Sequence, residues 1–249
     1  ALYYAIQLYY DNLDWPQNNH ELWRKRTAEY LPQAPCGHDG RWRWLLTDLD
    51  VGFGFSRSEP GNSLRRVVDL PADEYAIDVV SNIPANRMFR SLVLHNRQFR
   101  SLFISAAADL MNSAFVPQRA VALLQQFEAG IAPYRAEHNR RWHVNTAVQP
   151  SMFAFASNRP AMMRQHILAQ FGLAGTAEIT VNADSRRGRV QVNSLVIDEN
   201  LPGHPTPETP YPWMGIYFQG VPVRLTALPA PGYRFAGWQE YPEETAATL

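Results

Sequence analysis

The strongest constraint on the fold is a change in the spacing of apolar residues between residues 172 and 176. From about residue 83 to residue 172, apolar side chains recur with the three- and four-residue spacing of amphipathic helices. Beyond that point, stretches at 177–181, 189–193 and 221–227 alternate apolar with polar residues, and glycines separate them as in short β-strands. The pattern predicts an α+β chain with a mainly helical domain, residues 1–172, and a small C-terminal all-β sandwich, residues 173–249.

Residues with known capping preferences mark the ends of the predicted helices. They are Pro84, Asn96, Pro117, Pro150 and Gly172. The last helix has two possible starts, one at Pro150 and one at Pro160. Two apolar stripes are predicted to face the core: Phe99, Phe103, Ala107, Leu110 and Ala114, and then Val121, Leu124 and Phe127.

Residues 1–56 are predicted to hold an apolar helix, a polar loop and two short strand-like runs. The helix covers residues 1–10 (ALYYAIQLYY), and no N-cap or polar residue leads into it, so we expect further sequence upstream. The second strand-like run covers residues 41–46 (RWRWLL), after a loop rich in Pro and Gly. Residues 57–82 are predicted to be irregular, with a turn at residues 60–62.

Composition argues against several classes of function. The chain has 23 Lys and Arg against 23 Asp and Glu, so no overall charge favours nucleic acid or an anionic membrane. Cys36 is the only cysteine, which excludes an internal disulfide and a cysteine-based zinc site. No apolar run has the length needed to span a bilayer. We therefore expect a folded protein with no nucleic-acid partner and no transmembrane segment.

Two polar motifs carry the residues best suited to chemistry. Residues 11–19 (DNLDWPQNN) place Asp14 five residues before Asn19, and residues 48–54 (DLDVGFG) place Asp48 and Asp50 after a predicted strand. Protein kinases have the same order: a catalytic-loop Asp, an Asn five residues later, and the Asp of a D-F-G turn. These groups act at the attacking hydroxyl and hold divalent metal against the phosphates of ATP. We expect Asp50 to bind metal, and Asp48 to point the same way from an extended strand.

Each motif also has a purely structural interpretation. A D-x-x-x-x-N pair occurs by chance as a turn or cap, and Pro16 with the two Asn residues that follow can form a simple β-turn. Acidic residues also end many strands as solvated turns. The order of the two motifs, with a strand leading into the second, favours phosphoryl transfer. The seven His residues show no metal-binding spacing, and no G-x-S-x-G or G-x-x-x-x-G-K-[ST] motif occurs.

With these motifs, residues 1–172 resemble the CotH kinase-like family, the spore-coat-protein-H-like atypical protein kinases. The resemblance is carried by residues 11–19, 21–24 (ELWR), 41–54 (RWRWLLTDLDVGFG), 89–92 (FRSL), 99–103 (FRSLF) and 154–160 (AFASNRP). It implies a kinase C-lobe-like fold that transfers phosphate from ATP to Ser or Thr hydroxyls of a protein substrate, with Mg²⁺ or Mn²⁺. It also implies that Asp14 is the catalytic-loop Asp, that Asn19 and Asp50 hold metal and nucleotide, and that Asp48 is an auxiliary metal ligand.

The chain departs from a complete kinase in two respects. A kinase-like fold needs an N-terminal lobe with a phosphate-binding lysine, and the only lysine, Lys25, follows Asn19 too closely to serve. Val51 stands where a strict D-F-G has Phe. We therefore expect a fragment of a parent kinase that binds divalent metal weakly and does not turn over ATP without its N-terminal lobe.

Residues 232–238 (GYRFAGW) are similar to the ending of repeat-type β-domains in bacterial surface proteins. Both resemblances imply a bacterial protein outside the cytoplasm, secreted, at a cell surface or in a coat. The alternative function is a non-catalytic structural or adhesion module that binds a surface ligand through exposed aromatic residues: Tyr211, Trp213, Tyr217 and Trp238. The same aromatic residues fit the core of a β-sandwich equally well.

Overall fold

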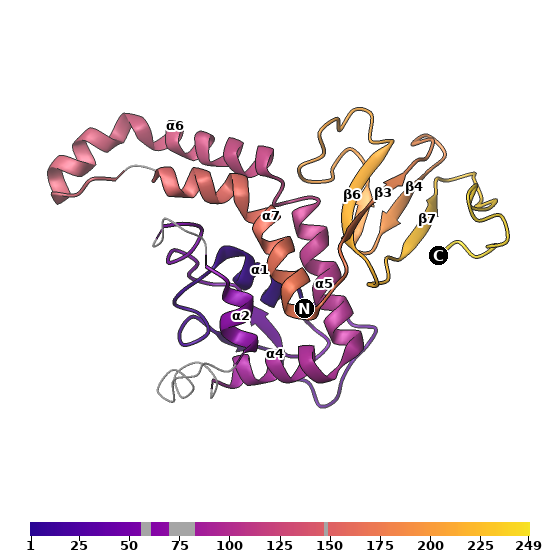
Figure 1. Ribbon diagram of the computed structural model, residues 1–249, viewed down its shortest axis with the longest axis horizontal. Helices are drawn as coiled ribbons and strands as arrows, with labels where there is room; N and C mark the ends of the chain where they lie inside the picture. Colours follow the sequence, from indigo (N-terminus) through magenta and orange to yellow (C-terminus); the bar gives the residue numbers. More distant parts are fainter. Residues whose placement is uncertain (56–60, 70–82, 147–148) are drawn as a thin grey trace.

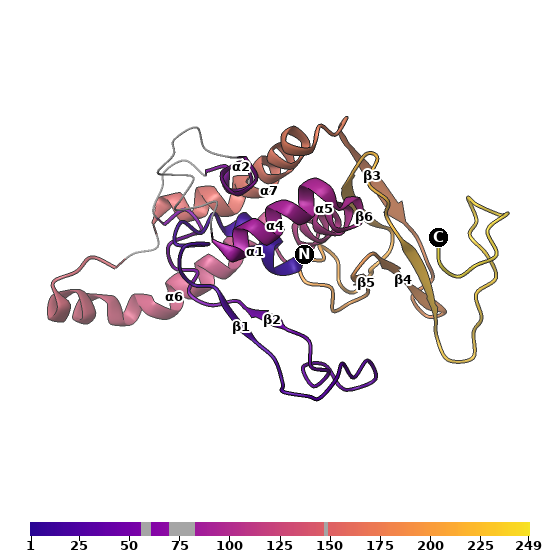
Figure 2. The same cartoon turned by 90° about the horizontal axis from the view of Figure 1, so that it is seen from below.

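The computed structural model describes residues 1–55, 61–69, 83–146 and 149–249. These residues form an α+β structure, with the helices gathered on one side and two small antiparallel sheets on the other (Figure 1). Two segments extend from the body (Figure 2): the far half of helix α6 (Pro117–Trp142), and a hairpin of strands β1 (Glu21–Trp23) and β2 (Arg43–Leu45). In these described ranges no helix is long and apolar enough to cross a membrane.

The ends of the helices confirm the capping predictions. The remaining described helices are α1 (Leu2–Tyr10), α2 (Ser63–Val68), α4 (Pro84–His95), α5 (Arg97–Met111) and α7 (Pro150–Phe171). The side chain of Asn96 accepts a hydrogen bond of 2.9 Å from the backbone nitrogen of Phe99, and Gly172 ends α7 in the left-handed conformation. Because α7 begins at Pro150, Pro160 lies inside the helix.

Helix α2 was not expected from the sequence, and the prediction of an irregular segment is wrong for residues 63–68. Its N-cap is Asn62, whose side chain accepts a hydrogen bond of 2.9 Å from the backbone nitrogen of Arg65. The helix buries Leu64, Val67 and Val68 against the helical body. A helix of this length is stabilised mainly by such packing, which a short sequence window does not reveal. Pro60, which opens the predicted turn, lies outside the described residues.

Helix α1 lies in the core of the helical body. Tyr4 stacks on Phe89 of α4 with ring centroids 4.6 Å apart, and Tyr9 stacks on Phe115 at 4.2 Å. Leu8 between them is fully buried. A helix that is apolar on most of its surface must be covered on several sides. This packing fixes the C-terminal end of α1, where the first polar motif begins.

The C-terminal part forms two antiparallel sheets. One pairs β3 (Thr176–Val181) with β6 (Trp213–Phe218), and the other has the order β5-β4-β7, with β5 (Leu195–Ile197), β4 (Gly188–Val192) and β7 (Leu225–Pro229). The strands predicted at 177–181 and 189–193 are confirmed to within one residue, whereas the one predicted at 221–227 begins at Leu225. One hydrophobic cluster joins the sheets to the helices. The β-sandwich and the division into residues 1–172 and 173–249 stay predictions.

Helix α5 contacts the sheets through a buried carboxylate. Asp109 is 3% exposed and accepts hydrogen bonds from the backbone nitrogen of Ser194 at 3.0 Å, the amide of Asn193 at 3.2 Å and the hydroxyl of Tyr217 at 3.1 Å. The hydroxyl of Ser194 donates a fourth, at 2.5 Å. Burial raises the pKa of Asp109. The helices and sheets are thus joined by directed polar contacts as well as by apolar packing.

The structure decides two predictions about apolar side chains, and one of them is wrong. Phe127 is predicted to face inward but is 66% exposed, because this part of α6 extends away from the body (Figure 1). The sequence leaves Trp213 and Tyr217 open between exposed binding residues and core residues, and both are buried, with 3% and 2% exposure. For these two residues the alternative interpretation as core is confirmed. Tyr211 and Trp238 are half-buried.

Candidate active site

The first motif begins where α1 ends. Asp11 is the C-terminal cap of α1 in the left-handed conformation, and its carboxylate accepts hydrogen bonds from the backbone nitrogen of Gly61, at 2.7 Å, and from the hydroxyl of Ser63. The guanidinium of Arg159 on α7 donates to the backbone oxygens of Leu8 and Tyr9 at 2.6 and 2.7 Å. These contacts satisfy carbonyl groups that the end of a helix leaves without partners. The loop therefore starts from a fixed point.

Residues 12–15, in the middle of the first motif, are anchored by contacts with α2 and with the hydrophobic core. The guanidinium of Arg66 donates hydrogen bonds of 2.9 Å to the backbone oxygens of Asn12 and Trp15. Trp15 is fully buried, and its indole nitrogen donates to the hydroxyl of Tyr3 at 3.0 Å. The peptide bond between Trp15 and Pro16 is cis. Asp14 is thus presented from an anchored loop.

The second motif lies against the first. The backbone nitrogen of Leu13 donates to the oxygen of Val51 at 3.1 Å, and that of Phe53 donates to the oxygen of Tyr10 at 2.7 Å. Gly52 sits at this junction, where an added Cβ would stand 2.8 Å from the backbone oxygen of Tyr10. Only glycine allows so close an approach. The two motifs, distant in the chain, therefore form one structural unit.

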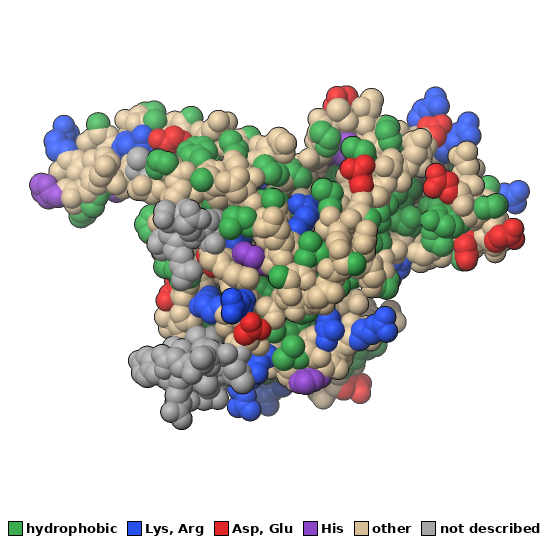
Figure 3. All heavy atoms as spheres, in the orientation of Figure 1, with side chains coloured by type: hydrophobic (Ala, Val, Ile, Leu, Met, Phe, Trp, Pro, Cys, Tyr) green, Lys and Arg blue, Asp and Glu red, His purple; other side chains and the backbone are tan. Residues whose placement is uncertain are grey.

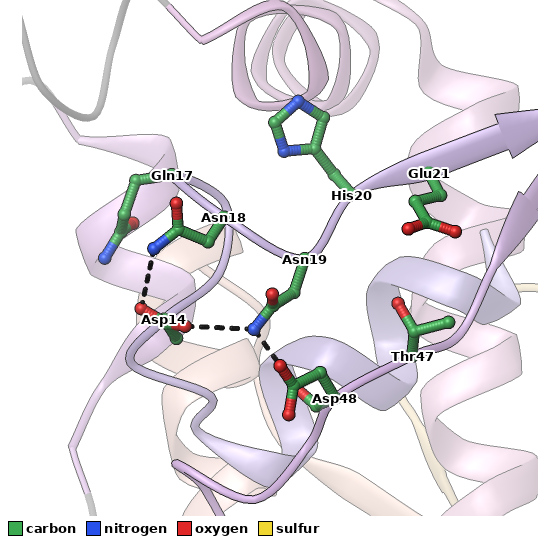
Figure 4. A pocket seen from close by; sticks show the side chains of 8 residues that line it. All are labelled: Asp14, Gln17, Asn18, Asn19, His20, Glu21, Thr47 and Asp48. Carbon is green, nitrogen blue, oxygen red and sulfur yellow. Dashed lines mark hydrogen bonds between the residues drawn. The ribbon is translucent and has the colours of Figure 1, made fainter.

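One pocket lies between the two motifs (Figure 4). It is lined by Asp14, Gln17, Asn18, Asn19, His20, Glu21, Thr47 and Asp48. Three of the four predicted site residues, Asp14, Asn19 and Asp48, are in this set. Asp50 is not, although it contacts Asp48 just outside. Its role as a metal ligand stays a prediction.

Two amides orient the carboxylate of Asp14. The Nδ2 atom of Asn18 donates to Oδ1 at 2.9 Å, and the Nδ2 atom of Asn19 donates to Oδ2 at 3.0 Å (Figure 4). Asn19 also approaches the backbone oxygen of Asp48 at 3.4 Å and adopts a left-handed backbone conformation. A nitrogen donor thus occupies the space between the two acidic residues. To bind a metal ion, Asn19 must turn its amide to present Oδ1, since only oxygen can serve as the ligand.

Asp48 and Asp50 do not lie in an extended strand as the sequence predicts. Strand β2 ends at Leu45, and the backbone of Asp48 is left-handed. This conformation places Asp48 in the pocket and Asp50 in the turn that follows. The two side chains remain in contact: a hydrogen bond to Asp50 and its negative charge raise the pKa of Asp48, with a smaller contribution from Asp14.

The pocket is lined by side chains with carboxylate and amide oxygens, the ligand types that a hard divalent cation takes. The hydrogen bond to Asp50, the negative charge of Asp50 and, to a smaller extent, that of Asp14 raise the pKa of Asp48, and a bound cation would offset the repulsion between these charges. In the described residues no group of three or more His, Cys, Asp or Glu side chains is placed so that it could hold a metal ion by itself. A Mg²⁺ ion beside a nucleotide does not need one, because phosphate and water supply the remaining ligands. Lys25 lies on the hairpin with its Nζ atom 3.4 Å from the ring of His38, which leaves the phosphate-binding lysine without a counterpart in this pocket.

The supporting arginines were not predicted individually. Arg66 falls in the segment that the sequence interpretation leaves irregular, and Arg159 lies in residues 154–160, which carry the family resemblance without an assigned role. Arg159 is fully buried and on a helix, and an Arg in such a place needs polar partners. That signal could have suggested a role as an anchor, though not which carbonyl groups it binds.

Comparison with known proteins agrees with this geometry. The family described as CotH kinase protein matches residues 1–163, which include both motifs, the hairpin between them and Arg159. The chain belongs to the CotH kinase family. No curated protein and no solved structure matches it. The CotH match ends inside α7, so the resemblance of residues 232–238 to repeat-type β-domains stays a prediction.

Proposed function

We propose that this CotH family member carries the catalytic loop of a metal-dependent protein kinase that transfers phosphate from ATP to Ser or Thr hydroxyls. The observation that carries the proposal is the junction of the two motifs, which brings Asp14, Asn19 and Asp48 to one pocket. Family membership agrees with it. Localisation in a coat or at a cell surface is part of the same proposal and rests on the family alone.

In the proposed reaction, Asp14 accepts the proton of the substrate hydroxyl while that oxygen forms a bond to the γ-phosphorus. The bond between this phosphorus and the bridging oxygen breaks, and ADP leaves. The amides of Asn18 and Asn19 each donate to one oxygen of Asp14 and so fix its orientation. A divalent cation, when bound, neutralises charge on the phosphates. Asp48, Asp50 and a turned Asn19 are the residues that would hold it.

The pocket also suggests a limit to the activity of this chain. Kinases use a lysine to hold the α- and β-phosphates of ATP. The only lysine of this chain, Lys25, lies on the hairpin and not in the pocket. We therefore expect the 249-residue chain to bind Mn²⁺ or Mg²⁺ weakly, to hold ATP poorly and to turn over slowly or not at all.

The direct test is phosphate transfer from labelled ATP to protein hydroxyls, measured on the longest form of the protein that can be expressed. We expect Asp14→Asn and Asp50→Ala to lower the rate by about 100-fold or more, with unchanged circular dichroism. Glu137→Gln, an exposed acid on α6 far from the pocket in sequence, is the matched control. Equal rates in wild type and Asp50→Ala would disprove the proposal.

Metal binding can be measured on the chain itself. In a titration followed by the paramagnetic signal of Mn²⁺, we expect Asp48→Asn and Asp50→Asn each to weaken binding by about tenfold. The Glu137→Gln variant should bind as wild type does. Mn²⁺ binding that is unaffected by both changes would place the ion elsewhere.

The second interpretation, a non-catalytic surface or coat module, lacks a comparable observation. Two of the four aromatic residues that suggest ligand binding, Trp213 and Tyr217, are buried in the core. Exposed aromatic residues remain near the C-terminus, at Tyr233 and Tyr241, but they are separate side chains on irregular segments. Single exposed aromatic residues are common on protein surfaces.

A further inference from the structure

The hairpin between the two motifs has features that catalysis at the pocket does not explain. We call residues 20–46 the arm. Its two ends enter the pocket, with His20 and Glu21 on one side and Thr47 directly after it on the other. In Figure 2 it extends from the helical body as a narrow projection. Strands β1 and β2 form its base, with Leu22 paired to Trp44.

The arm is an ordered structure. Asp39 is 3% exposed and binds the guanidinium groups of Arg41 and Arg43, each at 2.7 Å. Its backbone oxygen accepts a hydrogen bond of 3.0 Å from Leu31 across the arm. Because the carboxylate binds the Arg43 and Arg41 guanidiniums, the pKa of Asp39 lies well below its ordinary value. A buried carboxylate with two arginines fixes the shape of the segment.

The surface of the arm is unusually apolar for a projection. Trp42 is 62% exposed, and six further large apolar side chains of the arm are exposed: Leu22, Trp23, Tyr30, Leu31, Leu45 and Leu46. Guanidinium groups lie over two of the rings, Arg24 over Trp42 at 4.9 Å and Arg41 over Tyr30 at 5.4 Å. Several large exposed apolar side chains on one short segment are typical of an interaction site.

The arm is also basic, in a chain with a net charge of zero. It has five basic side chains against three acidic ones, and one of these, Asp39, is already bound by Arg41 and Arg43. The consecutive residues Arg24, Lys25 and Arg26 are exposed, and in the part of the chain that the structure describes no acidic side chain forms an ion pair with them. On the face seen in Figure 3, basic and acidic side chains are interspersed. The arm therefore carries an excess of positive charge in a chain that is neutral overall.

We propose that the arm docks an acidic segment of the protein substrate that also carries apolar side chains, and that it thereby presents a nearby hydroxyl to Asp14. The proposal rests on the proposed function, since it names the substrate class of that pocket. Charge complementarity selects acidic residues at Arg24, Lys25 and Arg26. The exposed leucines and Trp42 favour a polypeptide over a polyanion such as nucleic acid, because a phosphate backbone offers no apolar groups that could pack against them.

The test is binding of a labelled peptide, followed by fluorescence anisotropy in the absence of ATP. The peptide carries a central Ser with flanking Glu and Phe residues, and a counterpart has Gln in place of Glu. We expect the Glu peptide to bind about tenfold more tightly than the Gln peptide, with an affinity that falls as salt rises. We expect Arg24→Gln with Arg26→Gln, and separately Trp42→Ala, to weaken binding of the Glu peptide by about tenfold.

The matched control is Arg140→Gln with Arg141→Gln, which removes the same charge from the end of α6. It should bind the peptide as wild type does. Binding that is insensitive to the arm variants, or equal for the Glu and Gln peptides, would overturn the proposal. So would an oligonucleotide that binds the arm as tightly as the peptide, or self-association of the chain that Trp42→Ala abolishes.

The Asp14→Asn variant separates this proposal from the proposed function. We expect it to bind the Glu peptide normally even though it cannot accept the proton of the hydroxyl. If the longest form of the protein that can be expressed transfers no phosphate but binds the peptide through the arm, the proposed function fails and the docking surface stands. If phosphate transfer occurs at the same rate in wild type and in the arm variants on an acidic substrate, the docking surface fails and the proposed function stands.

Discussion

The side-chain amide of Asn12 donates a hydrogen bond of 3.2 Å to the backbone oxygen of Asp48, and this contact links the two motifs directly. Asn12 is fully buried and also donates to Oε1 of Gln7 at 3.1 Å. A buried amide with two acceptors can hold them at a fixed separation. The position of Asp48 relative to Asp14 therefore depends on a residue that does not line the pocket.

We expect Asn12→Ala to lower the free energy of unfolding by about 1–3 kcal/mol, because it leaves buried acceptors without partners. The same change should weaken Mn²⁺ binding, since Asp48 loses its support. Urea unfolding and the Mn²⁺ titration measure the two effects. Gln126→Ala, at an exposed position on α6, is the control and should change neither. Normal Mn²⁺ affinity in Asn12→Ala would show that the motifs are held together without this contact.

Gly52→Ala tests the close approach of the two motifs. An added Cβ would lie 2.8 Å from the backbone oxygen of Tyr10 and 3.2 Å from that of Leu49, so the backbone must move. We expect a loss of about 1–3 kcal/mol in the free energy of unfolding. At Gly130, inside α6, nothing lies within 4 Å of an added Cβ, so Gly130→Ala should instead stabilise by about 0.5–1 kcal/mol. Two variants of equal stability would contradict this account of Gly52.

Arg159→Lys keeps the positive charge on α7 but replaces the planar guanidinium with an ammonium group. Arg159 donates to three backbone oxygens, those of Leu8, Tyr9 and Gly61, and lysine cannot reproduce this planar arrangement. Since the site is fully buried, we expect a loss of about 2–4 kcal/mol in the free energy of unfolding, measured by urea. Arg97→Lys, at an exposed position of α5, should be neutral. A small effect at Arg159 would mean that packing alone fixes the end of α1.

Asp109→Ala tests the contact between α5 and the sheets. The change leaves the donors of Ser194, Asn193 and Tyr217 without their acceptor. We expect about 2–4 kcal/mol lower stability in urea, and faster proteolysis near residues 193–194. Asp198→Ala is the control and should cost less, because its carboxylate makes one long ion pair with Arg189 and accepts one exposed hydrogen bond, from the backbone nitrogen of Asn200. If the two variants unfold alike, the polar contacts at Asp109 do not hold the sheets to the helix.

The arm should stay ordered in moderately acidic solution. Because Arg43 and Arg41 lower the pKa of Asp39 below its ordinary value of 3.8, Asp39 stays ionised at pH 4, and its stabilising effect is lost only as the pH falls further toward the lowered pKa. We expect the amide hydrogens of Leu31 and Arg41, which donate to Asp39, to show constant protection against exchange from pH 6 to pH 4. In Asp39→Asn the protection should be low throughout this range. Protection in wild type that declines already above pH 4 would contradict the lowered pKa.

Local chemistry made several elements predictable. Pro84, Pro150 and Asn96 act within one helical turn, and Gly172 within one residue, so their effect does not depend on the rest of the chain. The alternation at 177–181 and 189–193 likewise identifies strands directly. Phe127 shows the limit of such reasoning, since its position on an apolar stripe is correct but its side chain is 66% exposed.

The sequence by itself determined the order and chemistry of the two motifs, because the spacing of Asp14 and Asn19 and the presence of Asp48 and Asp50 are properties of the chain. Only the tertiary structure decided which acid enters the pocket. The left-handed backbone of Asp48, supported by Asn12 from another part of the chain, places Asp48 inside and Asp50 beyond it. The helical body that holds Asn12 is fixed in turn by the contacts of Arg66 and Arg159, whose partners lie between 51 and 151 residues away. Contacts over such separations depend on the packing of the whole core, and no short sequence pattern encodes them.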